Sequence, residues 1–326
     1  CNRRCEDACT RATIDEAIAI DEVKKFIAMQ DLKAETRFIP KKVVPTLDGE
    51  FKQKIAIVGG GPAGISCAFY LAEKGYKPTI FEKNEKLGGM VVYGIPSFVL
   101  EKDIVAAEID ILREMGVEFK TGVEVGKDIT LNQLREDGYE AFYIAIGCQG
   151  GRKINVPGED ADGVMTGVDF LHITTDDENY KLTGDTVVIG GGNVAIDVSR
   201  SAVRCDSANV YQVSLETRDI MPALPEEIEL AESEGIKFHG GWGPKEILTE
   251  NGKVTGIVFK KCTQVKNAEG RFDPLYDESD TMTIPCSNVI LSVGQGTVWG
   301  DLLKDEAVEF RGPAPIADPV TYQTTV

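Results

Sequence analysis

IAIVGGGPAG at residues 55–64 and TVVIGGGNVA at residues 186–195 decide the fold, because the second stretch repeats the first with small changes. Each reads as a buried strand, a tight glycine turn and the first turn of a helix. Glycines there let the backbone approach a pyrophosphate, and the helix N-terminus supplies amide N–H groups to hold it. Two such units predict two dinucleotides bound side by side, with electrons passing between them.

The first unit carries the full pattern of a dinucleotide site. Gly59, Gly61 and Gly64 fit G-x-G-x-x-G. Glu82 ends the next predicted strand, 23 positions after Gly59, where a carboxylate accepts hydrogen bonds from a ribose diol. The segment LGGMVVYGIP at 87–96 adds glycines that suit a loop lying against a long cofactor, although an ordinary tight turn is the alternative. The other cofactor-binding residues expected around this site are Pro62, Ala63, Lys83, Gly89, Gly94, Ile95, Pro96, Val125, Gly147 and Gly294. This pattern resembles the FAD sites of two-dinucleotide flavoproteins.

The second unit bears on the choice of coenzyme. Gly190, Gly192 and Ala195 match G-x-G-x-x-A, and the same turn contains Gly191, Asn193 and Val194. Glu216 follows 26 positions after Gly190, near the end of the next predicted strand. A carboxylate bonds the 2′-OH of NADH and repels the 2′-phosphate of NADPH, so the sequence predicts a preference for NADH. Two readings oppose this prediction: Arg218 could swing to a phosphate, or Glu216 could be a solvated strand end.

The composition excludes several classes of partner. The formal net charge of −18 over 326 residues argues against nucleic acid and anionic membranes. The chain has no apolar run of about 18 residues and no visible signal peptide. Eight cysteines in such a chain favour a reducing compartment, so a cytoplasmic location is expected. The start at Cys1, without Met, suggests a fragment or a processed product.

The order of motifs predicts an α/β fold of two nested Rossmann-like domains. LSVGQG at 291–296 echoes AIGCQG at 145–150, which implies that the chain leaves one sheet after 147, builds a second domain and re-enters near 295. The expected limits are 1–50 for an N-terminal segment, 51–165 with 292–326 for the first domain, and 166–291 for the second. A helix over 22–30 capped by Asp21 is predicted, as is a β-meander over 253–290 with a loop at 266–280.

Seven motifs carry a family resemblance and occur in the family's order: CNRRCEDAC, VGGGPAGISCA, GGMVVYGIPSFVLEK, NVPGED, VIGGGNVAIDVSR, MPALPEEIELAESEGI and LSVGQ. The chain resembles the flavoprotein family that includes the glutamate synthase small subunit. The large subunit of the NADH-dependent ferredoxin:NADP oxidoreductase and the N-terminal half of dihydropyrimidine dehydrogenase are also similar. The resemblance implies a glutathione reductase-like arrangement, with FAD in the first site, NAD(P)H in the second and YGIP near the flavin ring.

The resemblance also assigns the N-terminal cysteines. Cys1, Cys5 and Cys9 match the last cysteines of the family's helical domain, which carries [4Fe–4S] clusters, so residues 1–50 would be the end of that domain. Three cysteines do not complete a four-cysteine cluster, and free thiols or a zinc site are the alternatives. Family members usually continue past YQTTV at 322–326 into a segment that closes the flavin site, which puts flavin retention by this chain in question. NADPH-using members carry two arginines where this chain has Leu215 and Glu216, in agreement with NADH.

The expected function is an electron-input module in which NADH reduces FAD. The cofactors carry this chemistry, so no catalytic acid–base residue is expected. His172 is interpreted as a packing residue and His239 as a surface or turn residue. No C-x-x-C or C-x₄-C follows the first glycine site, so a disulfide relay is not expected. Electrons would leave through clusters to a larger catalytic or electron-accepting subunit or domain, or to ferredoxin, in a hetero-oligomer. An electron-bifurcating transhydrogenase and an NADH-binding redox sensor are the alternatives.

Overall fold

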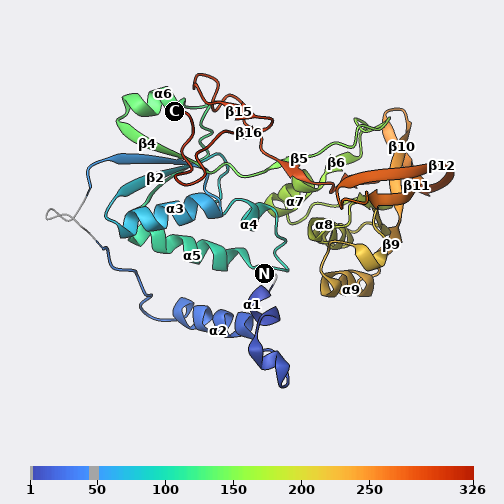
Figure 1. The fold of residues 1–326 in the computed structure, drawn as a ribbon, viewed down its shortest axis with the longest axis horizontal. Helices are drawn as coiled ribbons and strands as arrows, with labels where there is room; N and C mark the ends of the chain where they lie inside the picture. The colour runs from blue at the N-terminus through green and yellow to red at the C-terminus, as the bar shows by residue number, and fades with distance from the viewer. Residues whose placement is uncertain (1–2, 44–50) are drawn as a thin grey trace.

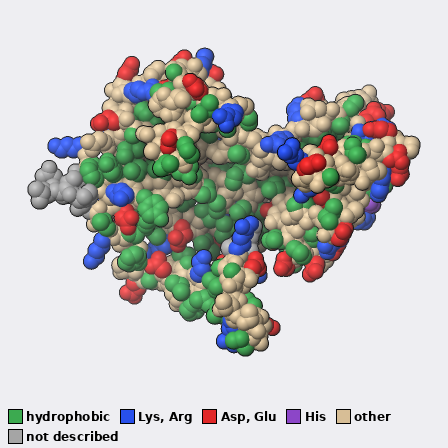
Figure 2. Space-filling model, viewed as in Figure 1, with side chains coloured by type: hydrophobic (Ala, Val, Ile, Leu, Met, Phe, Trp, Pro, Cys, Tyr) green, Lys and Arg blue, Asp and Glu red, His purple; other side chains and the backbone are tan. Residues whose placement is uncertain are grey.

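The computed structural model describes residues 3–43 and 51–326 and shows two lobes, each built on its own parallel sheet (Figure 1). A separate N-terminal group lies beside them, formed by α1 (Arg4–Asp7), the 3₁₀ helix η1 (Thr10–Thr13) and α2 (Ile20–Leu32). Apolar side chains gather around the hollow between the two lobes in the same view (Figure 2).

The first lobe has a four-stranded sheet in the order β3-β2-β1-β4, with all neighbours parallel. Its strands are β1 (Lys54–Val58), β2 (Lys77–Glu82), β3 (Glu118–Thr121) and β4 (Tyr139–Ile144). Its helices are α3 (Pro62–Glu73), α4 (Met90–Tyr93), α5 (Lys102–Glu114) and α6 (Leu131–Glu136). Because successive side chains of a strand point to opposite faces, Ile57 and Ile80 pack with residues of α3 and α5, whereas Val58 and Phe81 pack with residues of α6.

The second lobe has three layers. A five-stranded parallel sheet, in the order β6-β13-β7-β8-β9, has helices on one face and a three-stranded antiparallel sheet, β10-β11-β12, on the other. The parallel strands are β6 (Val164–Thr166), β7 (Thr186–Ile189), β8 (Val210–Ser214), β9 (Lys237–Gly240) and β13 (Asn288–Leu291). The antiparallel strands are β10 (Trp242–Glu250), β11 (Lys253–Lys266) and β12 (Phe272–Pro285). The helices are α7 (Gly167–Asp176), α8 (Asn193–Arg204) and α9 (Pro225–Ser233), with the 3₁₀ helix η2 (Arg218–Ile220) before α9.

Two short strands join the lobes, and they confirm the α/β fold with one domain nested in the other. β5 (Gly150–Gly151) leaves the first lobe and pairs antiparallel with β14 (Gln295–Gly296), which returns to it. The predicted limit at 165 falls inside β6, which pairs with β13 and so belongs to the second sheet. The chain then ends on the first lobe after the small hairpin of β15 (Phe310–Arg311) and β16 (Ala314–Pro315).

Two local predictions were wrong, and the interpretation of His239 as a surface or turn residue was wrong only as to the turn. Asp21 does not cap a helix, because α2 already begins at Ile20 and the Asp21 N–H donates to Glu6 Oε1 at 2.8 Å. The loop predicted over 266–280 is only 267–271, since β11 and β12 keep pairing as far as Lys266 and Phe272. His239 lies within β9 and not in a turn, and its ring is 6.0 Å from that of Tyr211.

Candidate dinucleotide sites

The turn between β1 and α3 has room for glycine alone at two positions. Gly59 has φ +111°, and a Cβ there would lie 2.3 Å from the carbonyl oxygen of Ala145. A Cβ on Gly64 would lie 1.9 Å from the carbonyl oxygen of Gly59. Helix α3 begins at Pro62 after the N-cap Gly61, with no side-chain cap. Its first amide groups are therefore available to an anion, as a pyrophosphate requires.

Glu82 is held in one orientation at the end of β2. Its side chain is almost fully buried; Oε2 accepts the Gly60 N–H at 2.7 Å and Oε1 accepts the Asn84 N–H at 2.8 Å. These two backbone donors fix the carboxylate over the glycine turn and leave lone pairs on both oxygens. Asn84 follows Glu82 by two residues. Its side-chain amide nitrogen is buried and has no hydrogen-bond partner in the described structure.

A cavity of about 460 Å³ opens in front of this turn. Nine of the predicted residues line it: Gly59, Gly61, Pro62, Ala63, Glu82, Lys83, Gly89, Val125 and Gly147. It is also lined by five residues that were not predicted from the sequence: Met90, Cys148, Gln149, Thr297 and Trp299. The last two come from the returning chain, which no local sequence pattern places here. The size and shape of the cavity suit part of a dinucleotide.

Gly94, Ile95 and Pro96 lie elsewhere. None of them lines the first cavity; Pro96 lines a second one, of about 310 Å³, together with residues of α7 and α8. The ammonium group of Lys102 donates to the carbonyl oxygens of Val91, at 3.0 Å, and of Ile95. This segment is therefore placed at the contact between the lobes.

The turn between β7 and α8 repeats the first one. Gly190 has φ +149°, and a Cβ there would lie 2.4 Å from the carbonyl oxygen of Ser292. A cavity of about 400 Å³ opens in front of it, lined by three residues predicted for this turn, Gly192, Asn193 and Val194. Gly294, which was expected at the first site, lines this cavity instead. Gly167, Ser292 and Gln295 line it as well and were missed. The Ser292 hydroxyl is buried without a hydrogen-bond partner in the described structure, which marks a place for a ligand atom.

The Glu216 carboxylate has the same position relative to the β7–α8 turn as the Glu82 carboxylate has relative to the β1–α3 turn. A Cβ on Gly191 would lie 2.9 Å from Glu216 Oε2, and a Cβ on Gly60 would lie 3.2 Å from Glu82 Oε2. The backbone of Glu216 is fixed, because its carbonyl oxygen accepts the Ser214 hydroxyl at 2.8 Å and the Gly241 N–H at 3.2 Å. Each turn thus carries a carboxylate over its middle glycine.

Arg218 is turned to another partner. Its Nε and Nη2 donate to the two oxygens of Glu232 at 3.0 and 3.1 Å, and this contact raises the pKa of the arginine.

The two cavities are lined by neighbouring stretches of a single segment. Gly294 and Gln295 line the one at β7–α8, and residues 297–300 line the one at β1–α3.

One half-buried carboxyl lies close to the β7–α8 turn. Asp197 is on the first turns of α8, and burial raises its pKa to about 6. The charge of Glu227 acts in the same direction, whereas those of Arg200 and Lys102 oppose it. His172 packs on Tyr93 with ring centroids 4.3 Å apart, across the contact between the lobes, and its Nε2 lies 3.2 Å from Asp176.

The predicted metal ligands are only partly described. Cys1 lies outside the described residues, Cys5 is exposed on α1, and Cys9 precedes η1. Backbone hydrogen bonds from Ile18 and Arg11 lower the pKa of the Cys9 thiol. No group of three histidine, cysteine or acidic side chains within 3–43 and 51–326 is placed to hold a metal ion. The cluster therefore stays a prediction.

None of the helices in the described part of the chain is long and apolar enough to cross a membrane.

Two nested parallel sheets, each with a glycine turn and a carboxylate at the end of the next strand, define a class of oxidoreductases that bind two dinucleotides. The sequence family described as pyridine nucleotide-disulphide oxidoreductase matches residues 53–316, and the chain belongs to this family of FAD- and NAD(P)-dependent oxidoreductases. The residues of both turns fit such ligands, because the space in front of Gly61 and Gly192 is open: a Cβ on Gly61 would meet no described atom closer than 3.7 Å, and a Cβ on Gly192 none within 4 Å.

Curated relatives extend over the whole chain. It is 36% identical to the NADP(+)-dependent formate dehydrogenase subunit beta of Moorella thermoacetica, covering 100% of this chain and 49% of that protein. It is 32% identical to a glutamate synthase [NADPH] small chain of Halomonas elongata, covering 99% of this chain and 70% of that protein. The chain spans about half the length of several curated relatives that it matches.

Solved structures share the fold at lower identity. FprA of Mycobacterium tuberculosis in complex with NADPH is similar with a TM-score of 0.67 and 22% identity, over 79% of this chain and 73% of that one. Thioredoxin reductase of Lactococcus lactis gives a TM-score of 0.60 and 21% identity, over 84% and 88% of the two chains.

Proposed function

We propose that this chain is the electron-input part of an NADH:acceptor oxidoreductase, with FAD at the β1–α3 turn and NADH at the β7–α8 turn. When both are bound, a hydride passes between the nicotinamide and the flavin. The observation that carries this proposal is the repeated geometry: each turn has a carboxylate over its middle glycine, and neighbouring stretches of one segment, 294–295 and 297–300, line the two cavities.

The protein's own contribution is position and polarity. The free amide groups at the start of α3 and α8 hold pyrophosphates, and Glu82 and Glu216 orient the adenosine riboses. The Ser292 hydroxyl is available to a bound coenzyme at the second cavity. No proton-transfer residue is needed for hydride exchange, and the proposal assigns none.

NADH is the proposed coenzyme because of what surrounds the 2′ position. The Glu216 carboxylate lies over Gly191, where it can accept a hydrogen bond from a 2′-OH and would repel a 2′-phosphate. Arg218, the counter-argument, is engaged by Glu232. Several curated relatives are named for NADP(H), so on this proposal the chain departs from them in coenzyme choice.

Electrons then leave through [4Fe–4S] chemistry to a larger subunit or domain. Cys1, Cys5 and Cys9 would supply ligands, together with cysteines from outside this chain. Two kinds of observation support this route: the described cysteines are free thiols, and relatives are named as small chains or beta subunits.

Reduction of a dye by the purified, FAD-loaded protein tests the proposal. NADH should support turnover with a kcat/KM at least as high as that of NADPH, and visible flavin bands should carry a broad brown shoulder if a cluster is present. About a tenfold advantage for NADPH, worth about 1.4 kcal/mol, would overturn the coenzyme assignment. No reduction by either coenzyme, with flavin bound, would favour a redox sensor.

A further inference from the structure

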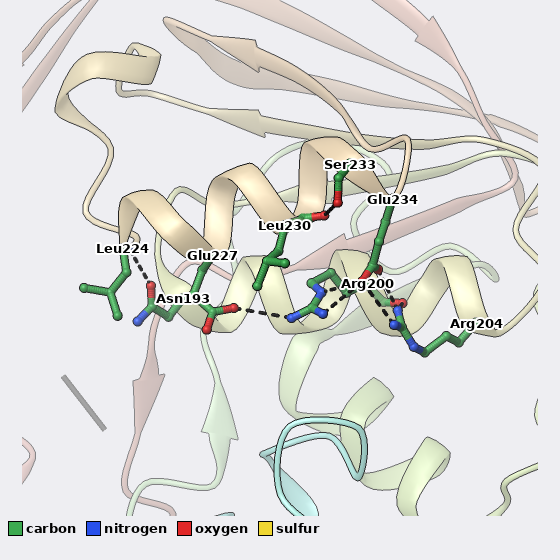
Figure 3. A network of polar contacts seen from close by, with 8 residues as sticks. All are labelled: Asn193, Arg200, Arg204, Leu224, Glu227, Leu230, Ser233 and Glu234. Atoms are coloured by element: carbon green, nitrogen blue, oxygen red, sulfur yellow. Dashed lines mark hydrogen bonds and ion pairs between the residues drawn. The ribbon is translucent and has the colours of Figure 1, made fainter. Parts of the chain in front are cut away.

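Glutamates of α9 and of its C-cap form ion pairs with every arginine in residues 193–234. Residues 193–234 contain three arginines, Arg200, Arg204 and Arg218. Glu234, which follows α9, pairs with Arg200 at 2.9 Å and with Arg204 at 2.6 Å, and Glu227 lies 3.4 Å from Arg200 (Figure 3). Glu232 pairs with Arg218 through both oxygens. The guanidinium groups of all three arginines are therefore directed to α9 and its C-terminal end.

Among these three arginines, Arg218 is the one that follows the end of β8, where the proposed coenzyme ribose lies. It lies two residues after Glu216, a separation of at most about 7 Å along the chain. A guanidinium binds phosphate oxygens through two parallel hydrogen bonds, so an arginine at this place is suited to a 2′-phosphate. Its long side chain points instead to Glu232, and Glu229 adds further negative charge beside it.

The position of α9 is itself tied to the second turn. The Leu224 N–H donates to Asn193 Oδ1 at 2.8 Å (Figure 3), and the Ala223 N–H donates to the carbonyl oxygen of Gly191 at 3.1 Å. Ile228 and Ala231 anchor the helix in the core. Glu232 is thus held at a fixed place relative to Gly191 and Glu216, as a residue that sets specificity must be.

We propose that Glu232 is a specificity-determining residue, which excludes NADPH by holding the Arg218 guanidinium away from the ribose 2′ position beside Glu216. This inference rests on the proposed function of the β7–α8 site. The expected effect of Glu232 on coenzyme binding is small, because the Arg218 and Glu232 side chains are 46% and 44% exposed and an ion pair in contact with water is weak. Releasing Arg218 should therefore strengthen binding of a 2′-phosphate by about fivefold, and not by orders of magnitude.

Equilibrium binding tests this without turnover. Isothermal titration of the FAD-loaded protein with NAD+, NADP+ and adenosine 2′,5′-bisphosphate would be compared among wild type, E232Q, R218A and the double variant E232Q/R218A. E232Q should lower the Kd for the two 2′-phosphate ligands by about fivefold relative to NAD+. R218A alone should leave these Kd values unchanged, and adding R218A to E232Q should abolish the gain.

The matched control is E226Q, which removes the same charge from an exposed position on the first turn of α9. It should leave the ratio of the NADP+ and NAD+ Kd values unchanged. The inference is overturned if E232Q does not change that ratio, if E226Q changes it equally, or if R218A weakens NADP+ binding in the wild-type background. Failure of the proposed function looks different, because then wild type binds none of the three ligands.

Discussion

Gly59 and Gly192 belong to the two glycine turns, but only Gly59 has protein neighbours that require a glycine. A Cβ on Gly59 would collide with the Ala145 carbonyl, so the protein's own packing demands glycine. A Cβ on Gly192 meets no described atom within 4 Å, and its φ is not positive. At Gly192, therefore, only a ligand would exclude a side chain.

Gly192→Ala should accordingly separate binding from folding. We expect the free energy of unfolding to change by less than about 1 kcal/mol, while the Kd for NAD+ rises at least about tenfold because the methyl group occupies the place of the pyrophosphate. Chemical denaturation and isothermal titration measure the two quantities. Gly59→Ala, in contrast, should destabilise the protein. Unchanged NAD+ binding by Gly192→Ala would show that this turn holds no dinucleotide.

Asp197 makes a prediction about pH. Its carboxyl has a pKa of about 6 in the folded chain, against an ordinary value of 3.8. Because the folded state binds the proton more tightly, this group's effect on stability becomes unfavourable as pH rises from 3.8 to 6 and stays so above it. Asp197→Asn should therefore raise the free energy of unfolding at neutral pH by about 2–3 kcal/mol.

The measurement is the pH dependence of urea unfolding for both proteins. Their difference in stability should be small near pH 4 and fully developed above pH 6. A difference that is constant across this range would mean that the Asp197 carboxyl is not perturbed by burial.

At the scale of elements, Glu234, the C-cap residue of α9, links α9 to α8 through ion pairs with Arg200 and Arg204. Arg200 and Arg204 hold the pKa of this carboxyl at about 2, below its ordinary 4.5. The lowered pKa means that the contribution to stability is complete above 4.5 and is lost as pH falls from 4.5 toward 2. Glu234→Gln should lower the free energy of unfolding at neutral pH by about 2–3 kcal/mol, since the nearly buried Arg200 loses its main partner.

Denaturant unfolding at several pH values checks this prediction. The deficit of Glu234→Gln should shrink as the pH falls below 4.5. Asp162→Asn, which breaks an exposed pair with Lys253 at 3.9 Å, is the control and should change little at any pH. A deficit that persists undiminished in acid would point to lost packing and not to charge.

The elements around the glycine turns could be predicted closely from sequence. An apolar run and a glycine are local signals, so the strand, the turn and the helix start predicted within residues 55–64 are confirmed as the end of β1, the glycine turn and the start of α3. The hairpin of β11 and β12 is different. The acidic, exposed part of β12 around Asp277 is typical of a loop in sequence, and only its pairing with Lys261 identifies it as a strand.

The candidate sites divide in the same way. Gly61 and Glu82 follow from spacing, and the structure places both on one cavity. Ser292 and Trp299 were missed because they reach the cavities only through the returning chain. The pairing of Arg218 with Glu232 depends on where α9 packs, which spacing does not fix.

At the scale of the whole molecule, one segment between β2 and α5 connects the lobes. Phe98 lies 3.8 Å from the Arg204 guanidinium, the Thr175 hydroxyl donates to the carbonyl oxygen of Val92 at 3.4 Å, and Tyr93 packs on His172. The same segment contains Gly89, where a Cβ would lie 2.8 Å from the Cα of Gly61 at the β1–α3 turn. We therefore expect a movement of the second lobe to be transmitted to the wall of the first cavity.

Lys102→Met should weaken that coupling. The ammonium group holds two carbonyls of this segment and attracts Asp197 of α8, so its loss should slow flavin reduction by NADH at least about threefold while the Kd for NAD+ stays unchanged. Stopped-flow absorbance and titration calorimetry provide the two readings, and Lys24→Met, on exposed α2, is the control. Equal rates in Lys102→Met and wild type would contradict the coupling.

The central claim is that a nicotinamide at the β7–α8 turn reduces a flavin at the β1–α3 turn of the same chain. An anaerobic titration of the FAD-loaded protein with NADH, followed by visible flavin absorbance, tests it most directly. The account predicts that about one equivalent of NADH bleaches the flavin within the time of mixing. Flavin that stays oxidised, although FAD and NAD+ are each shown to bind, would contradict it.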